Sequence, residues 1–257
     1  MTSTPALSHA LTESGPATGR PVLVLHGGGG PATVAPIAAH FARTAPVLLP
    51  THPGWNGTPR PGDLTRVADL AAAYLRLLRD RRLSDVLVIG SSLGGWIAAE
   101  LATADTEGLI SGVVLMNAVG IEVDGEPVRD FFALDARGVA EYAYHDPERF
   151  YVDPTTVPAE QRAVVQANLA ALRVYSGGPA MNDPALRPRL AAVTVPTLVV
   201  WGESDRIATP AYGEEYAASF ANARMELVPE AGHLPHLEQP ARTFPLLDAF
   251  ATQTARR

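Results

Sequence analysis

The chain has 257 residues, which suits one large α/β domain with an insertion and is too short for two full-sized domains. It contains no cysteine and no lysine, which excludes disulfides, a cysteine nucleophile, thiolate metal sites, Schiff-base chemistry and a P-loop lysine. The 27 acidic residues outnumber the 20 basic ones, giving a net charge of −7, so no nucleic-acid partner is expected.

The beginning of the chain carries no targeting pattern. Residues 1–20 contain neither the basic start nor the apolar run of a secretory signal. Nowhere do about 18 consecutive apolar residues occur, so no membrane span and no membrane partner are expected. These features predict a cytoplasmic protein.

Short apolar runs alternate with helical patterns along most of the chain. This alternation is typical of βα units around a largely parallel sheet, and it predicts the α/β class. The expected strands are 22–25, 46–49, 86–90, 113–117, 197–201 and 225–228, and the expected helices are 33–43, 64–81, 94–103, 210–220 and 241–251.

The first expected strand leads into the loop His26-Gly27-Gly28-Gly29-Gly30. A loop of this kind supplies a backbone amide to an oxyanion hole. Because the loop has neither the GxGxxG spacing nor a lysine, nucleotide binding is not expected. His26 is expected to brace the loop by hydrogen bonding. His52, in the loop after the second strand, either lines the mouth of a pocket or forms part of a turn.

The strand 86–90 runs into Gly90-Ser91-Ser92-Leu93-Gly94, a GxSxG pattern followed directly by a helix. This is the pattern of a nucleophile elbow, in which a serine sits on a tight strand-to-helix turn. Glycines on either side are needed because larger residues would clash in the turn. Ser92 is therefore the candidate nucleophile.

Two further motifs follow later strands. The strand 197–201 precedes Gly202-Glu203-Ser204-Asp205, and the strand 225–228 precedes Ala231-Gly232-His233. A serine hydroxyl needs a base within hydrogen-bond reach, and the base needs a carboxylate to orient it. His233 can provide the first and Asp205 the second, since residues after parallel strands meet at one edge of the sheet.

These motifs, in the order serine, aspartate, histidine, resemble those of the α/β-hydrolase superfamily from about residue 20 to about residue 250. The resemblance implies an α/β-hydrolase fold, a mostly parallel sheet flanked by helices, with an inserted helical cap. The antiparallel strands that open this family would be abbreviated, since only about twenty residues precede the first strand. The implied catalytic residues are Ser92 as nucleophile, Asp205 as acid and His233 as base, with the oxyanion hole formed by the amides of Gly28 and Leu93.

Other roles for these residues remain open. Asp205 could instead cap a helix or pair with Arg206. Glu122 and Asp124 are alternative acids, because some relatives of this fold place the acid after the earlier strand. His236 is expected to pack against the last helix rather than take part in catalysis.

Residues 121–188 interrupt the alternation with charges, prolines and short helical patterns. They are expected to form the cap, inserted into a core made of residues 1–120 and 189–257. Half of all Phe and Tyr residues lie in this quarter of the chain, as a lid over an apolar substrate would require, although each ring could equally be core packing. They are Phe131, Phe132, Tyr142, Tyr144, Phe150, Tyr151 and Tyr175.

The sequence thus predicts a serine hydrolase that cleaves a carboxylic ester or lactone with an apolar or aromatic part through an acyl-enzyme. Its expected partner is a small-molecule substrate, with no cofactor and no metal. A thioesterase or acyltransferase and a C–C bond hydrolase would use the same residues, although C–C hydrolases usually carry Trp where Leu234 follows His233. The alternative from another class is a non-catalytic binding protein on the same scaffold.

Overall fold

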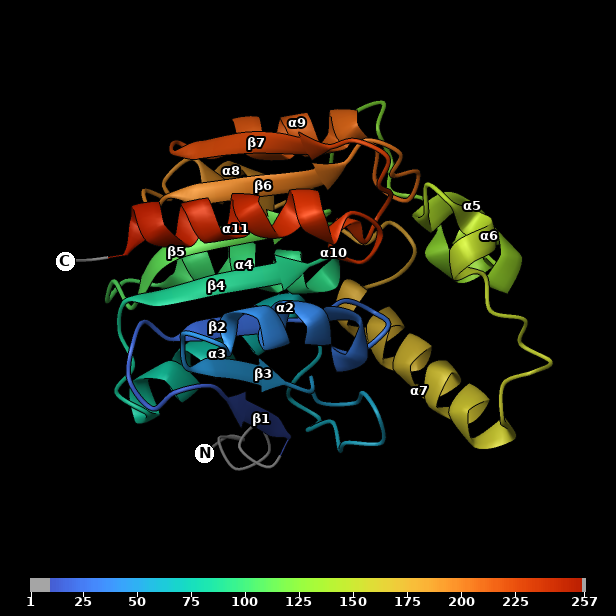
Figure 1. Cartoon of the computed structure of the whole chain (residues 1–257), viewed down its shortest axis with the longest axis horizontal. Helices are drawn as coiled ribbons and strands as arrows, with labels where there is room; N and C mark the ends of the chain where they lie inside the picture. The colour runs from blue at the N-terminus through green and yellow to red at the C-terminus, as the bar shows by residue number, and fades with distance from the viewer. Residues whose placement is uncertain (1–9, 256–257) are drawn as a thin grey trace.

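A seven-stranded sheet forms the centre of the protein in a computed structural model that describes residues 10–255 (Figure 1). The strand order is β1-β3-β2-β4-β5-β6-β7. All neighbours pair in parallel except β1, which is antiparallel to β3. The strands are β1 (Leu11–Ser14), β2 (Val22–Leu25), β3 (Val47–Pro50), β4 (Val86–Ser91), β5 (Ile110–Met116), β6 (Thr197–Gly202) and β7 (Ala223–Val228).

Helices cover both faces of this sheet, which is why its inner strands are buried throughout and mostly apolar. Successive side chains of a strand point to opposite faces. Val22 and Val24 pack with one set of helices, whereas Leu23 and Leu25 pack with the other. One face carries α2 (Ala35–Phe41) and α11 (Pro240–Thr254); the other carries α3 (Val67–Asp80), α4 (Leu93–Ala104), α8 (Leu186–Leu190) and α9 (Pro210–Ala218).

Every strand and helix expected from the sequence occurs, with ends that differ by no more than about three residues. The expected abbreviation of the antiparallel edge also agrees with the structure, because within residues 10–255 this edge consists of the four-residue strand β1. No helix in this part of the chain combines the length and the apolar character needed to cross a membrane.

The segment between β5 and β6, which pair directly, contains all of the residues expected to form the cap. Its helices α5, α6 and α7 lie beyond the carboxyl edge of the parallel strands (Figure 1). The short helix α8 crosses the expected boundary at residue 188 and packs on α4, where Arg189 pairs with the buried Glu100 at 2.9 Å. The elements are η2 (Phe131–Ala133), α5 (Ala136–Ala143), α6 (Pro147–Phe150) and α7 (Ala159–Ser176).

Candidate active site

Ser92 lies on the sharp turn between β4 and α4. Its backbone has φ 56° and ψ −119°, a strained conformation for a residue other than glycine and the one that a nucleophile elbow requires. A Cβ at Gly90 would lie 2.1 Å from the Gly94 carbonyl oxygen, and a Cβ at Gly94 would lie 2.1 Å from that of Leu25. Only glycine fits at either position, so these two residues allow the strand and helix to pack closely around the serine.

His233 and Asp205 come from loops that follow neighbouring strands. Asp205 lies after β6 and His233 after β7, and these strands pair in parallel. The His233 Nδ1 atom donates to Asp205 Oδ2 at 2.8 Å, and both side chains are buried. Because Nδ1 carries the proton in this bond, Nε2 is the nitrogen that can accept one.

Four donors surround the Asp205 carboxylate. Oδ1 accepts from the amides of Ile207 at 2.8 Å and Ala208 at 3.2 Å. Oδ2 accepts from Asn117 Nδ2 at 2.7 Å in addition to His233. Hydrogen bonds on both oxygens fix the plane of the carboxylate. The arrangement therefore holds Oδ2 of Asp205 in position against the imidazole of His233.

Asn117 is part of this site and was not anticipated from the sequence. It follows β5 with a φ of 45° and is fully buried. Besides its bond to Asp205, its side-chain oxygen accepts from the Gly202 amide at 3.4 Å. The available signal was a polar residue closing a run of apolar ones at the carboxyl edge of the sheet, next to the strand that carries Asp205.

Ser92 and His233 line the same cavity, which has a volume of about 160 Å³. No hydrogen bond joins the two side chains, although such bonds are commonly long before a substrate binds and tighten afterwards. The cavity is largely apolar, and its lining includes Val119, Leu172 and Leu234. The structure thus brings the candidate nucleophile, base and acid together at one place.

The amides of Gly28 and Leu93 are the expected donors of the oxyanion hole. Neither donates a hydrogen bond to any group within residues 10–255. Gly28 lines the cavity beside Ser92, and Leu93 is the first residue of α4, where the helix dipole favours a negative charge. The Trp55 indole donates to the Gly28 carbonyl at 2.9 Å, which fixes the orientation of the loop.

Comparison with known proteins agrees with this geometry. The sequence pattern of the alpha/beta hydrolase family matches residues 22–246. The chain belongs to this family. The expected fold and resemblance are therefore confirmed.

Among its relatives is a Mycobacterium tuberculosis protein named as a non-heme bromoperoxidase, 29% identical over 208 residues, which cover 74% of this chain and 76% of the relative. The 2-hydroxy-6-oxo-6-(2'-aminophenyl)hexa-2,4-dienoic acid hydrolase of Metapseudomonas resinovorans is 25% identical, covering 86% and 80%. An esterase structure from Exiguobacterium antarcticum superposes with a TM-score of 0.75 at 19% identity, covering 94% of both chains. The alpha/beta hydrolase fold thus extends over nearly the whole chain.

Two buried histidines support the glycine loop of this alpha/beta hydrolase. His26 Nδ1 donates to the Gly27 carbonyl at 2.7 Å, and its Nε2 accepts from the His52 amide at 3.0 Å. His52 Nε2 donates to the His26 carbonyl at 3.0 Å, and its Nδ1 accepts from the Tyr74 hydroxyl at 2.6 Å. His26 braces the loop as expected. His52 is fully buried beneath it and does not line the mouth of the cavity.

These imidazoles are held neutral, which predicts acid-sensitive folding. Burial lowers the pKa of His26 to about 4 and that of His52 well below 6.5; burial also lowers the pKa of His236 to about 4. The unfolded chain binds these protons below about pH 6.5 and the folded chain does not. The free energy of unfolding should therefore be fully present above pH 6.5 and fall by roughly 1.4 kcal/mol per pH unit per histidine as the pH drops towards 4.

Urea denaturation between pH 7.5 and 5 measures this effect. The exposed His145 offers a control, and His145→Gln should leave the pH dependence as in the wild type. A free energy of unfolding that is constant from pH 7.5 to 5 would show that the buried imidazoles are not linked to folding.

The alternative acids lie away from His233. Glu122 and Asp124 are exposed to solvent, and the carboxylate that contacts the imidazole is that of Asp205. Asp205 bonds to amides at the start of a turn, as a cap would, but also to His233. His236 is buried and donates from Nε2 to the Thr33 carbonyl at 2.7 Å. The bonding partner of His236 therefore belongs to η1 (Pro31–Val34), whereas the sequence pattern had placed it against the last helix.

Glu238 joins the loop of His233 to the start of the inserted segment. It lies at the end of α10 (Pro235–Glu238), and its buried carboxylate accepts from the Gly232 amide at 2.5 Å. Its other oxygen accepts from the amides of His145 at 2.9 Å and Asp146 at 3.2 Å. The His233 amide in turn donates to the Ala143 carbonyl at 2.6 Å. The loop of the candidate base is therefore held by the chain just after α5.

The aromatic residues of the inserted segment divide into two groups. Those that line a cavity are Phe131, Phe132, Tyr144 and Phe150. Those that pack against other side chains are Tyr142 on Arg129, Tyr151 on Arg137 and Tyr175 on Trp55. The expectation of an aromatic lid therefore applies to the first group only.

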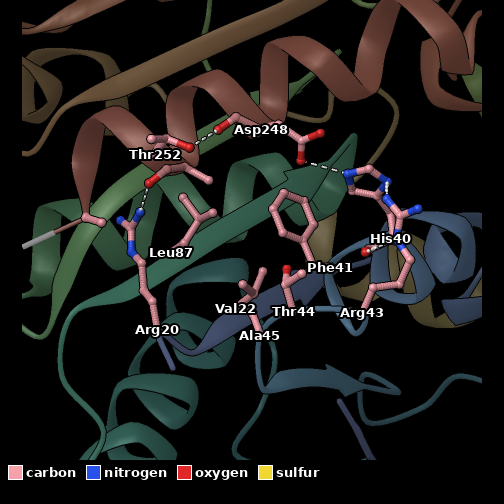
Figure 2. A pocket seen from close by; sticks show the side chains of 12 residues that line it. Arg20, Val22, His40, Phe41, Arg43, Thr44, Ala45, Leu87, Asp248 and Thr252 are labelled. Carbon is pink, nitrogen blue, oxygen red and sulfur yellow. Dashed lines mark hydrogen bonds and ion pairs between the residues drawn. The ribbon is translucent and has the colours of Figure 1, made fainter. Parts of the chain in front are cut away.

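Another hollow, of about 430 Å³, lies between α2 and α11 on the face of the sheet that these two helices cover (Figure 2). Figure 2 shows His40 between Asp248 and Arg43 at its rim. The His40 Nε2 atom donates to Asp248 at 2.7 Å, and Arg43 donates to its Nδ1 at 2.7 Å. No residue of the candidate active site lines this hollow. Within the described residues, no cluster of three or more His, Asp or Glu side chains could hold a metal ion.

Proposed function

We propose that this alpha/beta hydrolase is a serine hydrolase that cleaves a carboxylic ester or lactone with an apolar part through an acyl-enzyme on Ser92. The observation that carries the proposal is the buried His233–Asp205 pair, whose imidazole lines the same small apolar cavity as the elbow serine. The undonated amides of Gly28 and Leu93 beside that serine support it further. A non-catalytic binding protein would have no need for a strained serine at this turn.

In the proposed mechanism, the Ser92 hydroxyl attacks the ester carbonyl while His233 Nε2 takes its proton. The negative charge that develops on the former carbonyl oxygen is stabilised by the amides of Gly28 and Leu93. Asp205 stabilises the imidazolium. His233 then gives the proton to the leaving alkoxide, and the alcohol departs from the acyl-enzyme. A water molecule, deprotonated by His233, attacks the acyl carbonyl, and collapse of that intermediate returns the proton to Ser92.

The cavity and the relatives both bear on whether the protein cleaves an ester bond or a carbon–carbon bond. The similar Exiguobacterium antarcticum structure is an esterase, whereas the Metapseudomonas resinovorans relative cleaves a dienoic acid. Leu234, which follows His233 and lines the cavity, offers no polar group to a dienoate carboxylate. We therefore favour ester cleavage and keep C–C hydrolysis as the second candidate.

A substrate panel distinguishes these reactions. We expect p-nitrophenyl and alkyl esters or lactones to be cleaved with kcat/KM above about 10⁴ M⁻¹s⁻¹ for the best of them. Thioesters and vinylogous diketones should be poorer by at least about tenfold. Peroxide-dependent bromination, assayed in parallel, should be slower still than ester cleavage. A clear preference for the vinylogous diketones would instead identify a C–C hydrolase, and absence of turnover on all four classes would contradict the proposal.

A further inference from the structure

The helix α7 is anchored at one end and open at the other. In its C-terminal half, the Asn168 side chain accepts from the Asn56 amide at 2.8 Å, and the Tyr175 hydroxyl donates to the Pro53 carbonyl at 3.1 Å. Residues 159–167, in contrast, are all exposed. Figure 1 shows this half of the helix extending away from the sheet. The N-terminal half of the helix is therefore largely exposed to solvent.

One face of α7 forms a wall of a groove of about 800 Å³. The residues of that face recur at the spacing of a single helical stripe. The opposite wall is apolar and includes Phe131, Phe132, Phe150 and Val157. From one end of the stripe to the other the rise is roughly 16 Å. The stripe consists of Arg162, Val165, Gln166, Leu169, Ala170 and Arg173.

The two arginines of the stripe lie at its ends. Arg162 donates to the carbonyl oxygens of Pro154 and Val157, and Arg173 lies over the Phe132 ring at 4.3 Å. Between them the stripe presents Val165, Gln166, Leu169 and Ala170, and Asp135 lines the other side. The groove thus follows α7 with a mostly apolar lining, which fits an extended hydrocarbon chain better than a compact ring.

The groove adjoins the cavity of Ser92. Phe131, Val139 and Tyr144 line both. The inner cavity, at about 160 Å³, has room for the reacting group but not for a large substituent. A larger part of a substrate that extends from Ser92 past these three residues would enter the groove.

We infer that the groove along α7 binds an elongated aliphatic chain, on the order of ten carbons, that forms one side of the ester. This inference rests on the proposed function and adds the substrate class to it. Large apolar side chains that are exposed within residues 10–255 gather in the same region. Four of the five, Val152, Val164, Val165 and Val174, belong to α7 or the chain leading to it.

The length of the chain can be tested with esters of increasing size. For p-nitrophenyl esters of straight-chain acids, or for acetates of straight-chain alcohols, kcat/KM should rise about two- to threefold per methylene up to about C10 and then level off. A rise in either series supports the inference and shows which side of the ester the groove holds. A flat dependence in both series would overturn it.

Two variants on adjacent positions test the groove itself. Val165 lines it, whereas Val164 is exposed on α7 without lining it. Val165→Trp should fill the groove midway and lower the ratio of decanoate to acetate kcat/KM by at least about tenfold. Val164→Trp should keep the wild-type ratio. Equal ratios in the two variants would contradict occupation of the groove by the substrate.

A binding measurement separates this inference from the proposed function. Dodecanoate titrated calorimetrically into a Ser92→Ala variant should bind, and Val165→Trp in that background should weaken binding at least about tenfold. Binding without ester turnover in the wild type would contradict the function and leave the groove assigned. Turnover without dodecanoate binding would do the reverse. A phosphatidylcholine vesicle or a second copy of the protein could occupy the groove instead. Sedimentation should then show that association in the wild type and its loss in Val165→Trp, and kcat/KM should not depend on the length of the ester, which would contradict the inference.

Discussion

Replacing Ser92 with alanine is expected to lower kcat for every ester that the protein cleaves by roughly 10⁴- to 10⁶-fold. The acyl-enzyme cannot form without the hydroxyl, and what remains is the contribution of binding and of the two amides. The fold should persist, since the Ser92 hydroxyl has no hydrogen-bond partner within residues 10–255. Circular dichroism and thermal unfolding should therefore match the wild type.

Covalent labelling provides an independent measurement. A fluorophosphonate should add one label to the wild-type protein, as seen by intact mass spectrometry, and none to the Ser92→Ala variant. Ser219 is half-buried at the end of α9, and its hydroxyl donates to the Glu215 carbonyl. Ser219→Ala should keep both the label and the activity. A label retained in Ser92→Ala would place the nucleophile elsewhere.

Asp205→Asn is expected to lower kcat by about 10⁴-fold. The Asp205 carboxylate accepts four hydrogen bonds, two on each oxygen. In the asparagine variant, the side-chain NH2 group replaces one of these oxygens and must point at donors instead of accepting from them. If that group faces His233, the imidazole is forced into the other tautomer and its base nitrogen is lost. If it faces the amides of Ile207 and Ala208, the loop is strained instead, so the melting temperature should also fall.

Asp124→Asn is the matched control, because Asp124 is exposed and lies on the loop that was considered for the acid. It should have wild-type kcat and stability. Steady-state kinetics on the best ester of the panel, with thermal unfolding of both variants, decide the assignment. An Asp205→Asn variant within tenfold of the wild-type kcat would mean that another group orients His233.

Much of the fold and of the candidate site follows from local pattern. The glycines around Ser92 and the position of His233 in the loop that follows a strand are signals contained in a few consecutive residues. Asn117 could not be found in this way, because its role depends on β5 and β6 being neighbours. The burial of His52 depends likewise on β2 and β3 lying side by side, which brings its ring onto His26 with centroids 3.7 Å apart.

The groove along α7 could not be predicted from the sequence either. The pattern indicated only short helical segments and several aromatic residues in this region. The 18-residue helix α7 and its distance from those rings depend on how its C-terminal half is anchored, through Asn168 and Tyr175. Composition therefore predicted an aromatic lid as a whole. It could not separate Phe131, which faces the cavity, from Tyr175, which packs on Trp55.

The bonds made by Glu238 determine which part of the inserted segment can move. One carboxylate fastens residues 145 and 146 to Gly232, and the Ala143 carbonyl is fastened to His233 itself. Residues 143–146 are therefore attached to the loop of the candidate base, and an outward movement of these residues would displace His233. Any opening of the cavity is thus expected to leave α5 in place and to move the chain after Asp146, which includes α6 and the exposed half of α7.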